Sequence, residues 1–241
     1  MFHWTGDMIS FMQDAAAYGT YQKELCDWIC AELPEKEHVC DAGCGLGFLS
    51  LRLAERFSHV TAADISGDAL AVLRAQAAAR GVPNLDIRQT DLLAFSPDEP
   101  FDAMVFCLFG KMRQTLRMAK RCCRGRVVIV KKAFTHHRFS VSAVPIKDEV
   151  TDQAAAFLRE RGVPFSLSVR TFEMGQPLRS LGDAARFFEI YSKDAPGALT
   201  EEAIRSRLEE TADAQFPFYL PQRKALGRFT IDTQNIPEGF L

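Results

Sequence analysis

The stretch that decides this fold reads His38-Val39-Cys40-Asp41-Ala42-Gly43-Cys44-Gly45-Leu46-Gly47. Its first half is a short apolar run typical of a buried strand. Its second half carries three glycines in five positions, and a helical pattern begins at Phe48. A strand, a glycine turn and a helix in this order present backbone N–H groups to a ligand at a helix N-terminus. Glycine is suited to such a turn because it permits both a positive φ and close approach of a ligand to the backbone.

The spacing of the glycines argues against a dinucleotide as this ligand. The dinucleotide fingerprint is G-x-G-x-x-G, and counted from Gly43 it needs a glycine at the position of Phe48. The chain has G-x-G-x-G instead. A nucleotide-cofactor oxidoreductase therefore remains an alternative, which a titration with NAD would test. The structural alternative is a tight turn that binds no ligand.

An acidic residue follows at the end of the next predicted strand. This strand covers 59–64 and ends in Asp64, 17 residues after Gly47. An acid in this place, about 20 residues past a glycine turn, accepts hydrogen bonds from two ribose hydroxyls in nucleotide-binding proteins. The pattern therefore favours a ligand with a ribose, and a turn-forming aspartate is the alternative.

The stretch 41–47 resembles the first motif of class I S-adenosylmethionine (SAM)-dependent methyltransferases. The resemblance implies that the loop curls around the amino-acid end of SAM and that Asp41 holds the loop. It also implies that Asp64 binds the ribose, and that Asp91 and Leu92, after the predicted strand 85–90, contact the adenine. The cofactor-binding residues expected from this resemblance are Asp41, Gly43, Cys44, Gly45, Gly47, Asp64, Ile65, Asp91, Leu92, Cys107 and Tyr21.

The fourth family motif differs from that of base-modifying relatives. Those often carry Asn/Asp-Pro-Pro-Tyr/Phe, whereas this chain has Cys107-Leu108-Phe109-Gly110. No side chain here accepts a hydrogen bond from an exocyclic amine, so methylation of bases or glutamine amides loses support. After the predicted strand 126–130 come His136 and His137, at the edge where open α/β sheets bind ligands. We predict a general base among these two histidines, with ordinary exposed loop histidines as the alternative.

Composition limits the partners. The 241 residues carry a net charge of -2, so no global basic field attracts nucleic acid or anionic membrane. No apolar run reaches the roughly 18 residues of a membrane span, and no signal-peptide pattern opens the chain, so we expect a cytoplasmic protein. The seven cysteines lack the spacing of zinc sites, and we expect free buried thiols and no metal.

The alternation of strand and helix patterns predicts an α/β fold. The resemblance implies one doubly wound, mostly parallel sheet in the order 3-2-1-4-5-7-6 with the last strand antiparallel. We expect a single domain with an N-terminal helical lid at 1–35, a SAM-binding core at 36–173, a helical cap insertion at 174–221, and the last strand and tail at 222–241. The lid is a hypothesis, because its helices are equally compatible with simple packing on the sheet.

The predicted function is methyl transfer from SAM to an O, N, S or C atom of a small-molecule acceptor. The near-neutral charge disfavours nucleic acid, and the insertion is rich in aromatic residues suited to an apolar pocket. RNA or protein methylation, an oxidoreductase and a SAM-binding protein without catalysis remain alternatives. The oligomeric state and the acceptor stay open. The aromatic residues of the insertion are Phe187, Phe188, Tyr191, Phe216, Phe218 and Tyr219.

Overall fold

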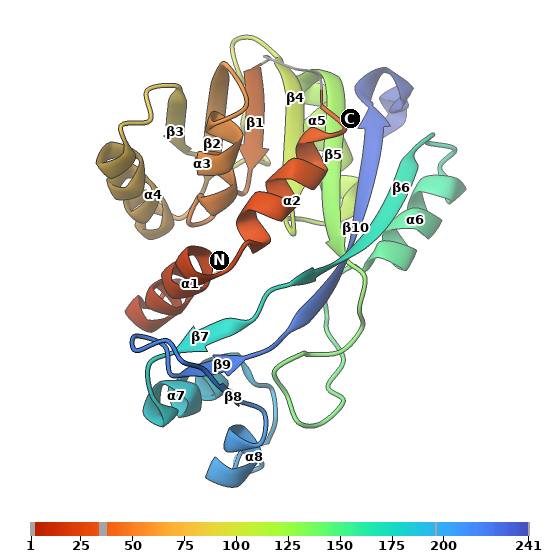
Figure 1. Cartoon of the computed structure of the whole chain (residues 1–241). Helices are drawn as coiled ribbons and strands as arrows, with labels where there is room; N and C mark the ends of the chain where they lie inside the picture. The colour runs from red at the N-terminus through yellow and green to blue at the C-terminus, as the bar shows by residue number, and fades with distance from the viewer. Residues whose placement is uncertain (1–2, 34–37, 196, 241) are drawn as a thin grey trace.

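The computed structural model describes residues 3–33, 38–195 and 197–240. Within them a seven-stranded sheet runs in the order β3-β2-β1-β4-β5-β10-β6 (Figure 1). Strands β3 to β5 of this order are parallel, and β10 is antiparallel to both of its neighbours. The predicted order and the antiparallel last strand are therefore confirmed. The strands are β1 His38–Ala42, β2 His59–Asp64, β3 Leu85–Gln89, β4 Phe101–Cys107, β5 Cys123–Lys132, β6 Ser166–Glu173 and β10 Arg223–Asp232.

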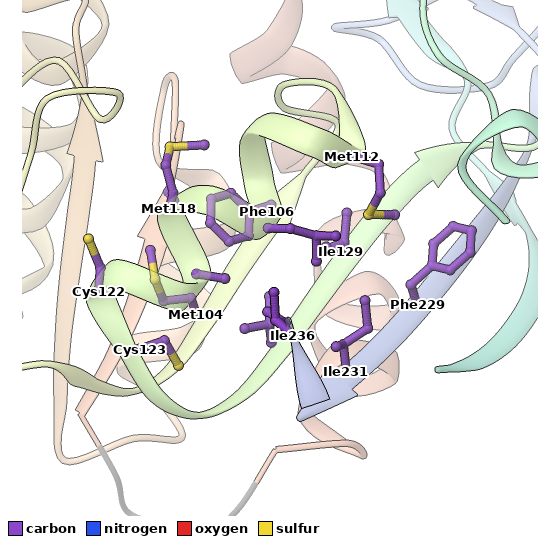
Figure 2. Close-up of a cluster of buried hydrophobic side chains, with 14 of the residues drawn as sticks. Met104, Phe106, Met112, Met118, Cys122, Cys123, Ile129, Phe229, Ile231 and Ile236 are labelled. Carbon is purple, nitrogen blue, oxygen red and sulfur yellow. The ribbon is translucent and has the colours of Figure 1, made fainter. Parts of the chain in front are cut away.

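Alternating side chains of the central strands build two buried layers, one on each face of the sheet. On β4, Met104 and Phe106 enter the layer covered by α5 and α6, whereas Ala103 and Val105 enter the layer covered by α2 and α3. Figure 2 shows the first layer, where Phe106 lies among side chains of α5, β5 and β10. Burial on both faces explains why these strands are apolar throughout. The covering helices are α2 Tyr21–Cys30, α3 Phe48–Ala54, α4 Gly67–Arg80, α5 Met112–Cys122 and α6 Thr151–Glu160.

The N-terminal helices bridge the sheet and the insertion. A glycine at position 19 predicts a break in the N-terminal helical pattern, and α1 Gly6–Tyr18 ends immediately before it. Thr20 is by residue type a candidate N-cap of α2, but its side chain makes no capping hydrogen bond. Its hydroxyl donates to Glu24 Oε1 at 2.7 Å instead. Pro34, which predicts the end of the second helix, lies outside the described residues.

The insertion at 174–221 differs from the expected helical cap, because it also contains a three-stranded sheet in the order β7-β9-β8. Its strands are too short to show a period in the sequence. It packs around Phe187 and Phe188, and α1 joins this core through Phe11, whose ring meets that of Phe187 at 5.3 Å. The remaining elements are α7 Leu181–Tyr191, α8 Glu201–Arg205, β7 Gln176–Leu178, β8 Glu209–Glu210, β9 Phe218–Leu220, η1 Thr233–Asn235 and η2 Glu238–Phe240.

The insertion is a continuation of the last two strands of the main sheet. In Figure 1, β6 leads into β7 and β9 leads into β10, so the small sheet lies beyond one end of the large one. Helix α1 lies beside the small sheet, and the side-chain amide of Gln176 on β7 donates to the carbonyl of Phe11 at 3.1 Å. The N-terminal helices are thereby fixed over the edge of the sheet at which the glycine loop emerges.

Candidate functional site

The glycine loop after β1 is tied to the end of β2. The amides of Gly43 and Cys44 both donate to the carbonyl of Ala63, at 2.8 and 3.1 Å. The loop then passes directly into α3, whose N-cap is Gly47 with φ +74°. Because the chain turns here within five residues, the N–H groups of the loop and of the first turn of α3 face the same edge of the sheet.

The three loop glycines have different roles. A Cβ on Gly43 would lie 2.2 Å from the ring of Phe109, and one on Gly47 would lie 2.3 Å from a leucine side chain of α4, so both positions are filled by internal packing. At Gly45 the nearest atom is Cζ2 of Trp4 at 3.6 Å. Gly45 therefore leaves its backbone open on the side that faces a cavity.

Asp64 holds the glycine loop in place. Its Oδ2 accepts a hydrogen bond from the Gly45 amide at 2.8 Å, and its Oδ1 accepts one from the Ser66 amide at 2.9 Å. One carboxylate thus joins the loop after β1 to the start of α4. Each oxygen retains a further lone pair, and the expected ribose contact of Asp64 stays a prediction.

Asp41 is buried in the wall of the cavity, with 2% of its surface exposed. The Ser50 hydroxyl of α3 donates to Asp41 Oδ2 at 2.6 Å. Burial raises the pKa of Asp41 to about 6, the hydrogen bond from Ser50 opposes the rise, and the charge of Asp64 adds to it. The family resemblance assigns the holding of the loop to Asp41. In the structure Asp64 accepts the loop amide, and Asp41 contacts the first turn of α3.

The cavity has a volume of about 430 Å³ and lies beyond the carboxyl ends of β1 and β4. Its floor is the glycine loop together with the ends of β4, β5 and β10. Its roof comes from α1, α2 and the residues before them. The side chains and backbone that line it belong to Trp4, Met12, Tyr21, Gln22, Leu25, Asp41, Gly43, Cys44, Gly45, Leu46, Gly47, Phe48, Leu49, Cys107, Leu108, Lys132, Met174 and Lys224.

The end of β4 carries backbone strain where it meets the cavity. Leu108 has φ +56°, while its amide donates to the Val130 carbonyl at 3.0 Å. A positive φ costs a residue with a Cβ roughly 1–2 kcal/mol, and such strain concentrates at functional sites. The next segment is anchored by Glu149, which accepts from the Met112 amide at 2.6 Å and pairs with Lys131 at 3.2 Å.

Seven of the predicted cofactor residues meet at this cavity, and four do not line it. Asp64 lies behind the loop, Ile65 and Asp91 are exposed, and Leu92 is buried in the layer beneath α5. The contacts expected of these four stay predictions. The residues that do line the cavity are Tyr21, Asp41, Gly43, Cys44, Gly45, Gly47 and Cys107.

The two predicted catalytic histidines lie in the segment between β5 and α6, outside the cavity lining. His136 is exposed, and its Nδ1 lies 2.9 Å from Thr135 Oγ1. The amide of His137 donates to the Val144 carbonyl at 2.7 Å. Burial lowers the pKa of His137, and the charge of Lys193 contributes to the same direction. Their catalytic role stays a prediction.

Sequence reasoning missed three cavity residues near the far wall, namely Lys132, Met174 and Lys224. The position of Lys224 could have been predicted from the sequence, because this residue lies at the start of the last strand, which is predicted to run antiparallel. The first residues of such a strand lie at the carboxyl edge of the parallel strands. Met174 gave no signal, since its position depends on how β6 leaves the sheet.

Potential metal ligands do not gather in one place within the described residues. All seven cysteines are free, and no group of metal-ligating side chains occurs in residues 3–33, 38–195 and 197–240. The same described residues hold no helix with the length and apolarity needed to cross a membrane.

The pKa of Asp41 generates a stability prediction. Folding raises this pKa, so the folded state holds the proton between about pH 4 and 6 while the unfolded state has lost it, and stability falls as pH rises through that window. Asp41→Asn removes this penalty and keeps an acceptor for Ser50. We expect the ligand-free variant to match the wild type near pH 3.5 and to be more stable by up to about 3 kcal/mol above pH 6.

Urea unfolding of the two proteins from pH 3.5 to 7.5 measures this difference. Asp86→Asn is the matched control, because Asp86 lies on the edge strand β3 of the same sheet in an exposed pair with Arg88. A stability difference between wild type and Asp41→Asn that does not grow from pH 4 to 6 would contradict the raised pKa.

Comparison with known proteins agrees with this geometry. Residues 39–127 match a family model described as a methyltransferase domain. YqeM of Bacillus subtilis (strain 168), a methyltransferase candidate by name, is 39% identical over 80 residues. That match spans 33% of this chain and 32% of YqeM, so the chain matches about a third of the length of its curated relative.

Two solved structures share the fold. The BH2331 protein of Bacillus halodurans C-125, a methyltransferase candidate by title, is 14% identical, with a TM-score of 0.57 over 89% of this chain and 99% of that one. The [4+2]-cyclase SpnF is 15% identical, with a TM-score of 0.55 over 94% of this chain and 92% of that one. The matched segment and the sheet order agree, and residues 39–127 are similar to a methyltransferase domain within a Rossmann-like fold.

Proposed function

We propose that the protein binds SAM in the cavity above the glycine loop and transfers its methyl group to a small molecule. The observation that carries this proposal is the open backbone of Gly45, which faces a cavity of about 430 Å³ beside the buried carboxylate of Asp41. A structural turn needs neither an open glycine nor a carboxylate held in a cavity wall.

The residues of this cavity fit SAM. Asp41 supplies a negative charge to the amino-acid end of the ligand, which carries an ammonium, and the Gly45 region lets that end approach the backbone. Tyr21 and Trp4 cover the loop from the roof and exclude water. In this proposal Asp64 and Asp91 bind the ribose and the adenine from the ends of β2 and β3. When bound, SAM supplies an electrophilic methyl group, so the protein mainly aligns the acceptor and keeps water out.

The acceptor is proposed to occupy an adjoining cavity of about 250 Å³. The two cavities share wall residues, including Met12, Tyr21 and Met174. The rings of Tyr18 and Tyr219 lie 5.5 Å apart in the wall of the second cavity. A cavity of this size with aromatic walls suits a small, largely apolar molecule.

The aromatic residues of the insertion support this proposal less than the sequence indicated. Phe187, Phe188 and Phe216 are buried, and the first two pack in the core between α1 and α7. Of the six aromatic residues named above, Tyr219 is the one that lines either cavity. The acceptor proposal therefore rests on the cavity and on Tyr18, Tyr21 and Tyr219.

Ligand stabilisation tests the cofactor. SAM or its demethylated product S-adenosylhomocysteine (SAH), at about 100 times its Kd, should stabilise the native state by roughly 2.7 kcal/mol. For a chain of this length that raises Tm by about 5–10 °C. Differential scanning fluorimetry with SAM, SAH and NAD measures the shift. A shift with NAD and none with either SAM species would overturn the proposal.

Gly45→Ala tests whether the open glycine faces the ligand. Gly45 has φ +54° and only the Trp4 ring, at 3.6 Å, in ordinary contact with its Cβ position, and Gly81, far from the cavity at the end of α4, has φ +61° with no atom within 4 Å. Both Gly→Ala changes should cost about 1 kcal/mol of stability through backbone strain. Only Gly45→Ala should weaken SAH binding in calorimetry, by about tenfold or more as a methyl group enters the ligand contact. Equal SAH affinity in both variants would remove Gly45 from the site.

Label transfer tests the acceptor class and separates the alternatives. With methyl-labelled SAM and a cell extract divided into small-molecule, RNA and protein fractions, we expect label in the small-molecule fraction. Bulk RNA at low salt should not compete, because the chain offers no global basic field. Label confined to RNA or protein would overturn the acceptor proposal. Tight SAM binding with no transfer to any fraction would favour a SAM-binding protein without methylation, since SpnF shows that the fold also occurs in a cyclase.

A further inference from the structure

Lys224 brings an amine into the cavity from the wall opposite the glycine loop. Strand β10 is antiparallel to β5, and Leu226 pairs with Lys132 at the carboxyl end of β5. Lys224, two residues earlier, therefore lies at the edge of the sheet where the cavity opens, and it lines that cavity. Between it and the glycine loop stand the ends of β4 and β5.

The surroundings of this amine lack a counter-charge. Lys224 Nζ lies 3.4 Å from the Met174 sulfur and 5.7 Å from the centre of the Tyr21 ring. A thioether is a weak acceptor. Among the described residues, no carboxylate lies within ion-pair distance of Nζ, whereas the neighbouring Lys132 pairs with Asp148.

The charged and titratable groups that face Lys224 come from four elements. They are Tyr21 of α2, Cys107 of β4, Lys132 of β5 and Arg138 of the segment after β5. Burial lowers the pKa of Lys224 to about 8, the positive charges of Arg138 and Lys132 act in the same direction, and Cys107 opposes them. At pH 7 about a tenth of this amine is uncharged, a far larger share than in an exposed lysine.

We propose that Lys224, as a neutral amine, takes up the proton that an O–H or N–H methyl acceptor gives up during transfer. The proposal rests on the SAM-dependent function proposed above. It adds a substrate class, because an acceptor that keeps its proton at neutral pH needs such a base. Lys224 Nζ lies in the same cavity as the proposed methyl donor and beside the Tyr21 and Met174 walls shared with the acceptor cavity.

The step balances in atoms and charge. The acceptor atom forms a bond to the methyl carbon, the sulfonium S–C bond breaks, and its electron pair stays on sulfur. The proton of the acceptor moves to the lone pair of Lys224 Nζ. One positive charge is lost at sulfur and one is gained at nitrogen, so the net charge of the cavity is unchanged and the low-dielectric site bears no extra charge.

The same charge argument favours a neutral amine over an anion-binding ammonium. A cavity that receives a sulfonium already gains a positive charge, and Lys132 and Arg138 lie near Lys224. An ammonium at Lys224 would repel the methyl donor but not its uncharged-sulfur product. This difference between the two ligands can be measured without knowing the acceptor.

Calorimetric titration of the whole protein with SAM and with SAH, from pH 6.5 to 9, tests the proposal. Below its pKa the ammonium of Lys224 disfavours SAM, and above it the neutral amine does not. The ratio Kd(SAM)/Kd(SAH) should therefore fall with rising pH around pH 8. We expect a fall of at least tenfold, because direct proton transfer requires Nζ about 6 Å from the sulfur, and like charges at that separation correspond to about a hundredfold at an effective dielectric constant of about 20.

Three variants bracket this result. Lys224→Met, which suits a site beside Met174, should hold the ratio at its low value at every pH. Lys224→Arg, which stays charged, should hold it at its high value. Lys23→Met, at an exposed helical position paired with Asp27, should behave like the wild type. A wild-type ratio that does not change with pH, or that still changes in Lys224→Met, overturns the proposal. If neither ligand binds the wild type, the SAM-dependent function is wrong and this proposal is wrong with it.

The rate of methyl transfer gives the second readout. It is measured with the fraction of the cell extract that accepts label from SAM. Lys224→Ala should lower the transfer rate by about 10²- to 10⁴-fold and should be rescued by added ethylamine, while guanidinium should not rescue it. With Lys224 as the base, the wild-type transfer rate should rise with pH around pH 8, and this rise should be lost in the variant. If the lysine were merely structural, its replacement would neither remove this rise nor allow rescue by an amine. Transfer at the wild-type rate and pH dependence in Lys224→Met, or full activity in Lys224→Arg, overturns the proton-acceptor role.

Discussion

The hydrogen bond from the Gly45 amide to Asp64 Oδ2 is the interaction on which the site depends. Three neighbouring parts of the fold meet there, because Asp64 ends β2, Gly45 belongs to the loop after β1, and the second oxygen of Asp64 receives the amide that opens α4. Without this carboxylate the Gly45 amide would lose its acceptor, and the loop would be held by the hydrogen bonds to Ala63 and by packing at Gly43 and Gly47. The open face of Gly45 is a consequence of this arrangement.

The cavity built on this loop is electrically asymmetric. Asp41 places a buried negative charge at the β1 wall, and Lys224 places an amine without a carboxylate partner at the β10 wall. A buried charge such as that of Asp41 is costly without a partner. A ligand with a cationic amino-acid end at one side and a reacting centre toward the other would offset this cost. The partly buried Lys224 has a lowered pKa, and its neutral form is suited to receiving a proton.

Much of this arrangement follows from the sequence, and the rest depends on long-range packing. The glycine spacing and Asp64 predict the loop and a nucleotide-type fold from local geometry, and the resemblance to class I methyltransferases implies the sheet order. They do not reveal that Asp64 holds the loop amide, since the distance from the end of β2 to Gly45 depends on how the strands align. Lys224 escaped prediction because its neighbours, Met174 just after β6 and Tyr21 of α2, are far away in the chain. The short strands β7 and β9 left too few residues for a period of two to be visible.

A crystal structure of the protein with SAH tests the central claim most directly. The claim predicts the amino-acid end of SAH against Gly45 and Asp41, its sulfur directed toward the part of the cavity that Lys224 lines, and its ribose on the side of Asp64. SAH bound outside this cavity, or a cavity closed by α1 and α2 in the presence of SAH bound elsewhere, would contradict it.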